Sequence, residues 1–135
     1  MKIVLDTNVL VSGIVFSGPP NKILHSWSRG KVQLVVTPEI LDEYRTVVIE
    51  LHGKFSGVEG GPILDLIVVN SVLCAPARLP RPVCVDPADD KFIACAVSSG
   101  ANIIVSGDKH LKAASGYRGI TVVSPRGFVD RYLGD

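Results

Sequence analysis

The chain has 135 residues, of which 20% are charged and 47% hydrophobic, and its formal net charge is +1. This length and composition are typical of a single globular, soluble domain over residues 1–135, and they exclude a disordered tail. The balanced charge excludes an overall basic signature for nucleic acid, so a polyanionic partner would have to bind a local patch. The amino terminus, MKIVLDTN, resembles neither a signal peptide nor a membrane span, and we expect a cytoplasmic protein with no membrane partner.

Four apolar runs of strand length recur at residues 2–5, 32–36, 102–106 and 120–123. Each run is continuous rather than alternating, as expected for strands that are covered on both faces. Segments with a helical period separate them, so the sequence predicts an α/β fold. We expect a mostly parallel central sheet of four to five strands with helices on both faces.

The helical segments carry recognisable start and stop signals. Thr37 is expected to be an N-cap with Pro38 at the first helical position, and Asp86 and Pro87 repeat this pattern. The glycine-rich residues 53–62 are interpreted as a mobile connection inside the domain. The expected helices, each ending at a glycine, span residues 21–30, 37–53 and 86–100.

The cysteines and histidines show no pattern of a zinc site. Cys74, Cys84 and Cys95 are odd in number and form no C-x-x-C pair, so we interpret them as small buried thiols in a reducing compartment. The three histidines are scattered and lack an H-E-x-x-H pattern, which disfavours a zinc hydrolase.

Acidic residues fall at positions where ligands of parallel sheets bind. Asp6 follows the strand at 2–5 directly, and Asp108 follows the run NIIVSG, so both are expected beyond the carboxyl ends of strands. Glu43 is expected on or beside the apolar face of its helix, three residues after Ile40 and four before Val47. Taken singly, the aspartates could be turn residues, and Glu43 could reach water from the edge of the apolar stripe.

Three more aspartates lie in the stretch VCVDPADDKFIACA. Asp86 is interpreted as the N-cap, and Asp89 as a support of the first helical turn, as in a capping box and through the helix dipole. Asp90 has no such structural role. It lies three residues before Ile93 on the apolar seam of its helix, where it would face either solvent or a cleft at the sheet edge.

Convergence of Asp6, Glu43, Asp90 and Asp108 would have a chemical consequence. Like charges in a partly buried cleft repel strongly, so such a cluster must either hold protons or bind a cation. Carboxylates without histidine or thiolate are hard oxygen ligands, which suit Mg²⁺ or Mn²⁺. Carboxylate-held Mg²⁺ is a common arrangement for phosphodiester hydrolysis.

Three segments together resemble a PIN domain of the VapC-like branch, the toxin components of toxin–antitoxin pairs: VLDTNVLVSGIV, TPEILDEY and DPADDKFIACAVSSGANIIVSGDKHL. The resemblance covers nearly the whole chain and implies a single PIN-like domain. It implies a ribonuclease that depends on one or two Mg²⁺ or Mn²⁺ ions, that often forms a homodimer, and that a cognate antitoxin silences. The implied catalytic and metal-binding quartet is Asp6, Glu43, Asp90 and Asp108.

The resemblance also suggests residues around this quartet. Asn8 and Ser106 match polar supporting positions, whereas Thr7, which matches too, is better interpreted as a helix-start hydroxyl. Candidates for contacts with RNA phosphates directly follow Asp108, although a solvated surface is the simpler interpretation of any single one. They are Lys109, His110 and Lys112.

Three other functions are alternatives to a ribonuclease. A receiver-type signalling domain also has an acidic Mg²⁺ pocket, but it requires paired acids after the first strand and gives no role to Glu43 or Asp90. A haloacid-dehalogenase-like phosphatase would need a second aspartate at position 8, which is Asn8. A non-catalytic RNA-binding protein with the PIN fold stays open, although the intact quartet argues against it.

Overall fold

A computed structural model describes residues 1–54 and 60–134, and its centre is a five-stranded sheet in the order β3-β2-β1-β4-β5. Every neighbouring pair of strands is parallel. The four apolar runs coincide with β1, β2, β4 and β5 to within about one residue at each end, whereas the two-residue edge strand β3 was not expected. The strands are β1 (Lys2–Leu5), β2 (Gln33–Val36), β3 (Val72–Leu73), β4 (Ile103–Val105) and β5 (Thr121–Val123).

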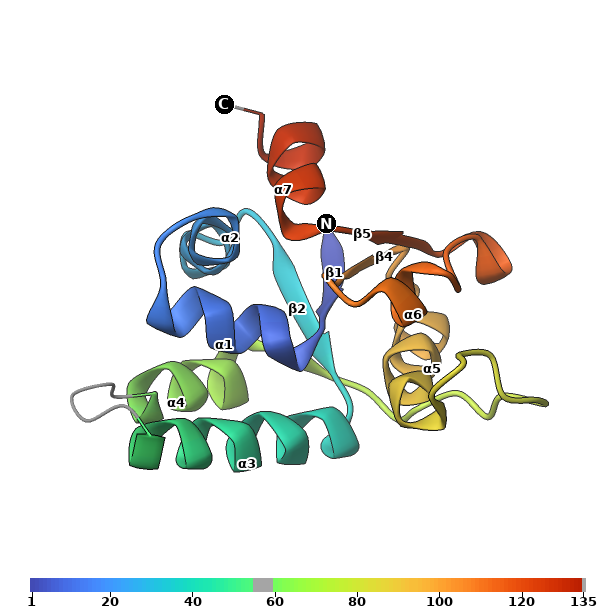
Figure 1. Ribbon diagram of the computed structural model, residues 1–135, viewed down its shortest axis with the longest axis horizontal. Helices are drawn as coiled ribbons and strands as arrows, with labels where there is room; N and C mark the ends of the chain where they lie inside the picture. The colour runs from blue at the N-terminus through green and yellow to red at the C-terminus, as the bar shows by residue number, and fades with distance from the viewer. Residues whose placement is uncertain (55–59, 135) are drawn as a thin grey trace.

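Helices cover both faces of the sheet, as the sequence predicts. The chain steps from β1 through β2 to β3 and then returns past β1 to β4 and β5, so right-handed crossovers place the two sets of helices on opposite faces. Helices α1–α4 lie on one side of the strands and α5 and α6 on the other (Figure 1). The helices are α1 (Thr7–Val15), α2 (Pro19–Ser28), α3 (Pro38–Lys54), α4 (Gly61–Asn70), α5 (Asp90–Ser99), α6 (Lys109–Lys112) and α7 (Pro125–Phe128), with the 3-10 turns η1 (Pro87–Asp89) and η2 (Tyr117–Gly119) and the π-helical segment η3 (Val129–Leu133).

The predicted helix starts are confirmed. The amide of Ile40 donates to Thr37 Oγ1 at 3.3 Å, and Pro38 opens α3. Asp86 Oδ1 accepts from the amide of Ala88 at 3.0 Å, but the first turn is a 3-10 turn, η1, and α5 itself begins only after it. This difference in helix type changes the directions of the side chains that follow Asp86.

The expected connection at 53–62 is shorter than predicted. Helix α3 continues through Lys54 and α4 begins at Gly61, while residues 55–59 lie outside the described residues. Helix α4 was not predicted, because its first turn has no side-chain cap and its apolar residues do not follow one narrow stripe. Among the described helices, none combines the length and apolar character that crossing a bilayer would require.

One buried tyrosine connects the helical layer to the strand that leads into Asp6. Tyr44 on α3 is 0% exposed, and its hydroxyl donates to the carbonyl of Leu5 at the end of β1. Burial raises the pKa of this hydroxyl well above its usual value, so the hydroxyl stays protonated and remains a donor. Tyr44 therefore fixes α3, and with it Glu43, against the carboxyl end of the central strand.

The crossing of α1 and α2 depends on Gly13. A Cβ at this position would lie 2.7 Å from Leu24 Cδ1 and 2.9 Å from the carbonyl oxygen of Pro20. We expect Gly13→Ala to lower the free energy of unfolding by about 1–3 kcal/mol, because the backbone of α2 must shift. Gly53→Ala is the control: its Cβ meets nothing within 4 Å, and alanine in a helix should stabilise by about 0.5–1 kcal/mol. Urea unfolding measures both, and a Gly13→Ala protein as stable as the parent would contradict this packing.

Candidate active site

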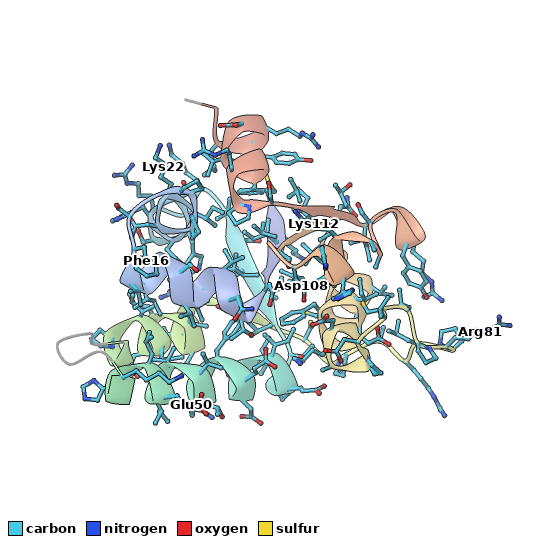
Figure 2. The ribbon with its side chains drawn as sticks, viewed as in Figure 1. Phe16, Lys22, Glu50, Arg81, Asp108 and Lys112 are labelled. Carbon is cyan, nitrogen blue, oxygen red and sulfur yellow. The ribbon has the colours of Figure 1, made fainter. Side chains whose placement is uncertain are left out.

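Asp6 and Asp108 lie at the point where the strand order reverses. Asp6 follows β1 and Asp108 lies three residues beyond the end of β4, and these strands are direct neighbours with Leu5 opposite Val105. The amide of Asp6 donates to the carbonyl of Val105 at 3.0 Å, which continues the pairing to the sheet edge. Asp108 lies where the chain leaves β4 and enters α6 (Figure 2). Such switch points are where doubly wound sheets bind ligands.

Ser106 connects the two aspartates. It is 0% exposed, its hydroxyl donates to Asp6 Oδ2 at 2.6 Å, and the same oxygen accepts from the amide of Asp108 at 3.0 Å. Asp108 Oδ1 in turn accepts from the amide of His110 at 2.8 Å and caps α6. Asn8, the other expected supporting residue, is exposed and lines a cavity of about 390 Å³ together with Asp108.

The carboxylate of Asp6 lies in the electric field of its neighbours. Burial raises the pKa of Asp6, and the negative charges of Asp108 and Glu43 raise it further. The Ser106 hydroxyl and the amide of Asn8 oppose this change without cancelling it. Three members of the predicted quartet therefore interact electrostatically around one buried carboxyl group.

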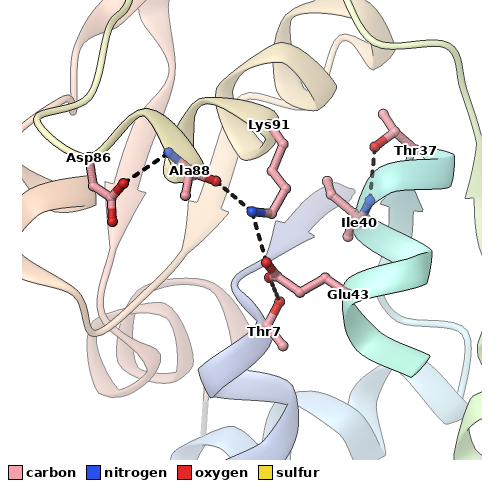
Figure 3. A network of polar contacts seen from close by, with 7 residues as sticks. All are labelled: Thr7, Thr37, Ile40, Glu43, Asp86, Ala88 and Lys91. Atoms are coloured by element: carbon pink, nitrogen blue, oxygen red, sulfur yellow. Dashed lines mark hydrogen bonds and ion pairs between the residues drawn. The ribbon is translucent and has the colours of Figure 1, made fainter. Parts of the chain in front are cut away.

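Glu43 reaches the site from α3, but both of its oxygens are engaged. Oε1 lies 2.8 Å from Nζ of Lys91, and Oε2 accepts from the hydroxyl of Thr7. Lys91 also donates to the carbonyl of Ala88 at 2.5 Å, which completes a chain of contacts from α1 through α3 to η1 (Figure 3). Neither Thr7 nor Lys91 was expected to contact the quartet. The one signal in the sequence is that Lys91 directly precedes the apolar run Phe92–Val97 within α5.

Asp90 has a structural role that its position in the sequence did not predict. Its Oδ1 accepts from the amide of Cys84 at 2.7 Å, and its Oδ2 from the amide of Val83 at 3.1 Å. The segment before Asp86 folds back over the start of α5, and Asp90 anchors it there. Helical periodicity carries no information about such a return of the chain, so the prediction that Asp90 lacks a structural role is wrong.

Asp89 is oriented differently from the sequence prediction. Within the described residues, its Oδ2 is buried without a hydrogen-bond partner, and its side chain makes no capping contact, so the capping-box interpretation is wrong. Burial raises the pKa of Asp89, and the charges of Asp108 and Asp6 raise it further. The 3-10 turn η1 explains the difference, because its residues advance by about 120° each instead of 100°. The geometry thus favours Asp89 over Asp90 as the third carboxylate.

The donor set suits a hard divalent cation, although the described residues form no ready-made cage. In residues 1–54 and 60–134, no group of three or more acidic, histidine or cysteine side chains is placed to hold a metal ion as it stands. Mg²⁺ does not need such a cage, because it keeps several waters and is often held by one or two carboxylates. The unpartnered oxygen of Asp89 and the charge-crowded carboxyl of Asp6 fit this mode. The nearby thiol of Cys84 does not, because burial raises its pKa to about 12.

The expected RNA-contacting residues lie together on α6. Lys109, His110 and Lys112 are all exposed. Figure 2 shows Asp108 and Lys112 at the two ends of α6. Their contact with RNA stays a prediction.

Comparison with known proteins agrees with this architecture. The family described as PIN domain matches residues 2–110. The chain belongs to the PIN domain family. Such domains are typically nucleases and generally use divalent metal ions.

One solved structure shares the PIN fold of this chain, the crystal structure of PAE2754 from Pyrobaculum aerophilum. The TM-score is 0.64 at 14% identity, over 100% of this chain and 91% of that chain. Identity at this level shows the fold alone. No curated protein matches this PIN domain.

The crowded carboxylates of this PIN domain should make the stability of its metal-free form depend on pH. The pKa of folded Asp6 lies above its unfolded value, so the folded state binds the proton more tightly, and the free energy of unfolding falls as pH rises through that window. Asp6→Asn removes this loss. In EDTA, we expect the melting temperature of the variant minus that of the parent to increase from pH 4 to pH 7. A difference in melting temperature that stays constant or decreases over this pH range would contradict electrostatic crowding at Asp6.

Asp89 and Asp90 should respond differently to the same substitution. Asp89→Asn should weaken Mn²⁺ binding and leave the fold intact. Asp90→Asn should lower the free energy of unfolding by about 1–3 kcal/mol, because an amide offers one acceptor oxygen to the two backbone amides that Asp90 binds. Calorimetric Mn²⁺ titration and urea unfolding separate the effects. A stable Asp90→Asn protein that has lost its metal would reverse the two roles.

Proposed function

We propose that this PIN domain is an Mg²⁺- or Mn²⁺-dependent endoribonuclease that hydrolyses phosphodiester bonds of RNA. The observation that carries the proposal is the Ser106 bridge, which holds Asp6 and Asp108 together at the switch point of the sheet. The unpartnered oxygen of Asp89 in the field of both is a second support. Repulsion among these carboxylates favours a bound cation.

The residues that would hold the ion are Asp6, Asp89 and Asp108. When bound, the ion supplies charge stabilisation and activates water for in-line attack on phosphorus. Ser106 fixes the carboxylate of Asp6 and the backbone of Asp108, whose own carboxylate is oriented by the amide of His110, so the site needs little reorganisation during the reaction. Glu43 adds negative charge at the α3 side of the site, and Asp90 acts on the site through the segment that it anchors.

The substrate would bind at the exposed surface beyond the carboxyl ends of β1 and β4. Lys109, His110 and Lys112 on α6 would meet backbone phosphates, and the exposed amide of Asn8 lies on the rim of the cavity that Asp108 lines. Contacts of this kind act on phosphate and not on bases, so they supply affinity without sequence preference.

We further propose that the protein is the VapC-like toxin of a cytoplasmic toxin–antitoxin pair, that it forms a homodimer, and that a cognate antitoxin covers its site. The sequence resemblance supports this role. Exposed apolar side chains on α4 and β3 also favour a surface that a second copy covers. They are Leu66, Val68, Val69, Val72 and Leu73.

The ribonuclease proposal is tested with labelled single-stranded RNA in Mg²⁺, Mn²⁺ or EDTA. We expect metal-dependent cleavage by the parent and a loss of at least about 100-fold in Asp6→Asn and Asp108→Asn, because each removes charge from a preorganised electrostatic site. Asp42→Asn is the matched control, since Asp42 is 75% exposed and pairs only with Arg45 on the same helix among the contacts of the described residues.

Cleavage that survives EDTA or either active-site substitution would contradict a metal-dependent nuclease. RNA binding without cleavage under all conditions would instead favour the non-catalytic PIN-fold protein.

A further inference from the structure

Lys91 is a cation inside the acidic centre. Its side chain is 10% exposed, and its ammonium group contacts Glu43 Oε1 at 2.8 Å and the carbonyl of Ala88 at 2.5 Å. Figure 3 shows these contacts between the starts of α5 and α3, with Thr7 on the other oxygen of Glu43. A lysine this far removed from solvent requires a charged partner, and Glu43 is that partner.

The Lys91–Glu43 pair differs from an ordinary surface ion pair. Arg45 and Asp42, on the outer side of α3, are 3.3 Å apart with side chains 52% and 75% exposed, and such pairs contribute little. In the Lys91–Glu43 pair the lysine is almost fully desolvated and Glu43 is 34% exposed, so the attraction is screened much less. Breaking it would leave an ammonium group buried without a partner, which is costly.

The charge of the centre follows from this pair. Asp6, Asp89, Asp108 and Glu43 bring four formal negative charges, and their mutual repulsion acts on Asp6 and Asp89. Without a lysine, two divalent ions would balance four carboxylates. With Lys91 on Glu43, three aspartates remain: one divalent ion leaves them one negative charge, whereas a second would leave an excess positive charge beside the ammonium group. A second ion at Glu43 would have to displace the ammonium or lie directly against it.

We propose that Lys91 is the built-in counter-ion of this site, which holds Glu43 and restricts the centre to one divalent ion. This inference rests on the proposed function and specifies its metal stoichiometry. Lys91 is thereby a positioning residue: it keeps the Glu43 carboxylate on the α3 side, away from the ion that Asp6 and Asp108 would hold. A purely structural role, in which Lys91 only joins α5 to α3, would leave the number and affinity of bound ions unchanged.

Calorimetric titration with Mn²⁺, with bound ions counted by electron paramagnetic resonance, tests the inference without a substrate. Lys91→Met keeps the aliphatic stem and removes the charge, Lys91→Arg keeps the charge, and Lys31→Met is an exposed control. We expect one ion per chain in the parent, Lys91→Arg and Lys31→Met proteins. We expect two in Lys91→Met, with the first bound on the order of tenfold more tightly, because a nearby positive charge is gone.

A double variant keeps the test decisive if Lys91→Met does not fold. Lys91→Met with Glu43→Gln removes both partners and avoids an unpaired buried charge, which often costs little. We expect it to bind one ion with a Kd within about threefold of the parent, because Glu43 is not a ligand in the parent protein. Loss of metal binding in this variant would overturn the inference.

The remaining outcomes separate the two proposals. Two ions in the parent, or an unchanged count and Kd in a folded Lys91→Met protein, would overturn the role of Lys91 and leave the metal-dependent ribonuclease standing. A parent protein that binds no Mn²⁺ and cleaves no RNA would overturn both.

Discussion

The hydrogen bonds of Ser106 to both Asp6 and Asp108 are the interaction on which the site depends. Carboxylates at the ends of two adjacent strands repel each other, and a buried hydroxyl that donates to one and accepts from the backbone amide of the other holds them in place. This proximity destabilises the ionised carboxyl group of Asp6. Burial and the neighbouring negative charges raise its pKa. Bound metal would relieve that crowding.

The fold brings these groups together through its winding. Because the chain reverses direction in the sheet after β3, β4 is placed beside β1, and two aspartates distant in sequence become neighbours. Tyr44 fixes α3 to the end of β1, and Asp90 fixes the start of α5 through the segment at residues 83 and 84. The site therefore lies at the ends of regular elements whose positions are set by buried contacts, which suits a function that depends on preorganised charge.

Sequence patterns predicted the features that short stretches of the chain determine by themselves, such as the strands and the residues that follow them. Continuous apolar runs predicted the parallel strands. The positions of Asp6 and Asp108 after such runs predicted that both lie at the carboxyl edge of the sheet. Local patterns do not predict the contacts that form where the chain folds back on itself. The environments of Asp89 and Asp90 are the reverse of those expected, because of the 3-10 turn η1 and the segment before Asp86. The contact of Lys91 with Glu43 joins α5 to α3, and the periodicity of each helix carries no information about how the two are rotated relative to each other.

The central claim is that the carboxylates at the switch point hold one divalent ion and that Lys91 occupies the place beside Glu43. Anomalous diffraction from crystals grown in Mn²⁺ tests it most directly. We expect a single anomalous peak in contact with Asp6 and Asp108, with the Lys91–Glu43 ion pair intact. A peak at Glu43 with the lysine displaced, or no peak at the ends of β1 and β4, would contradict it.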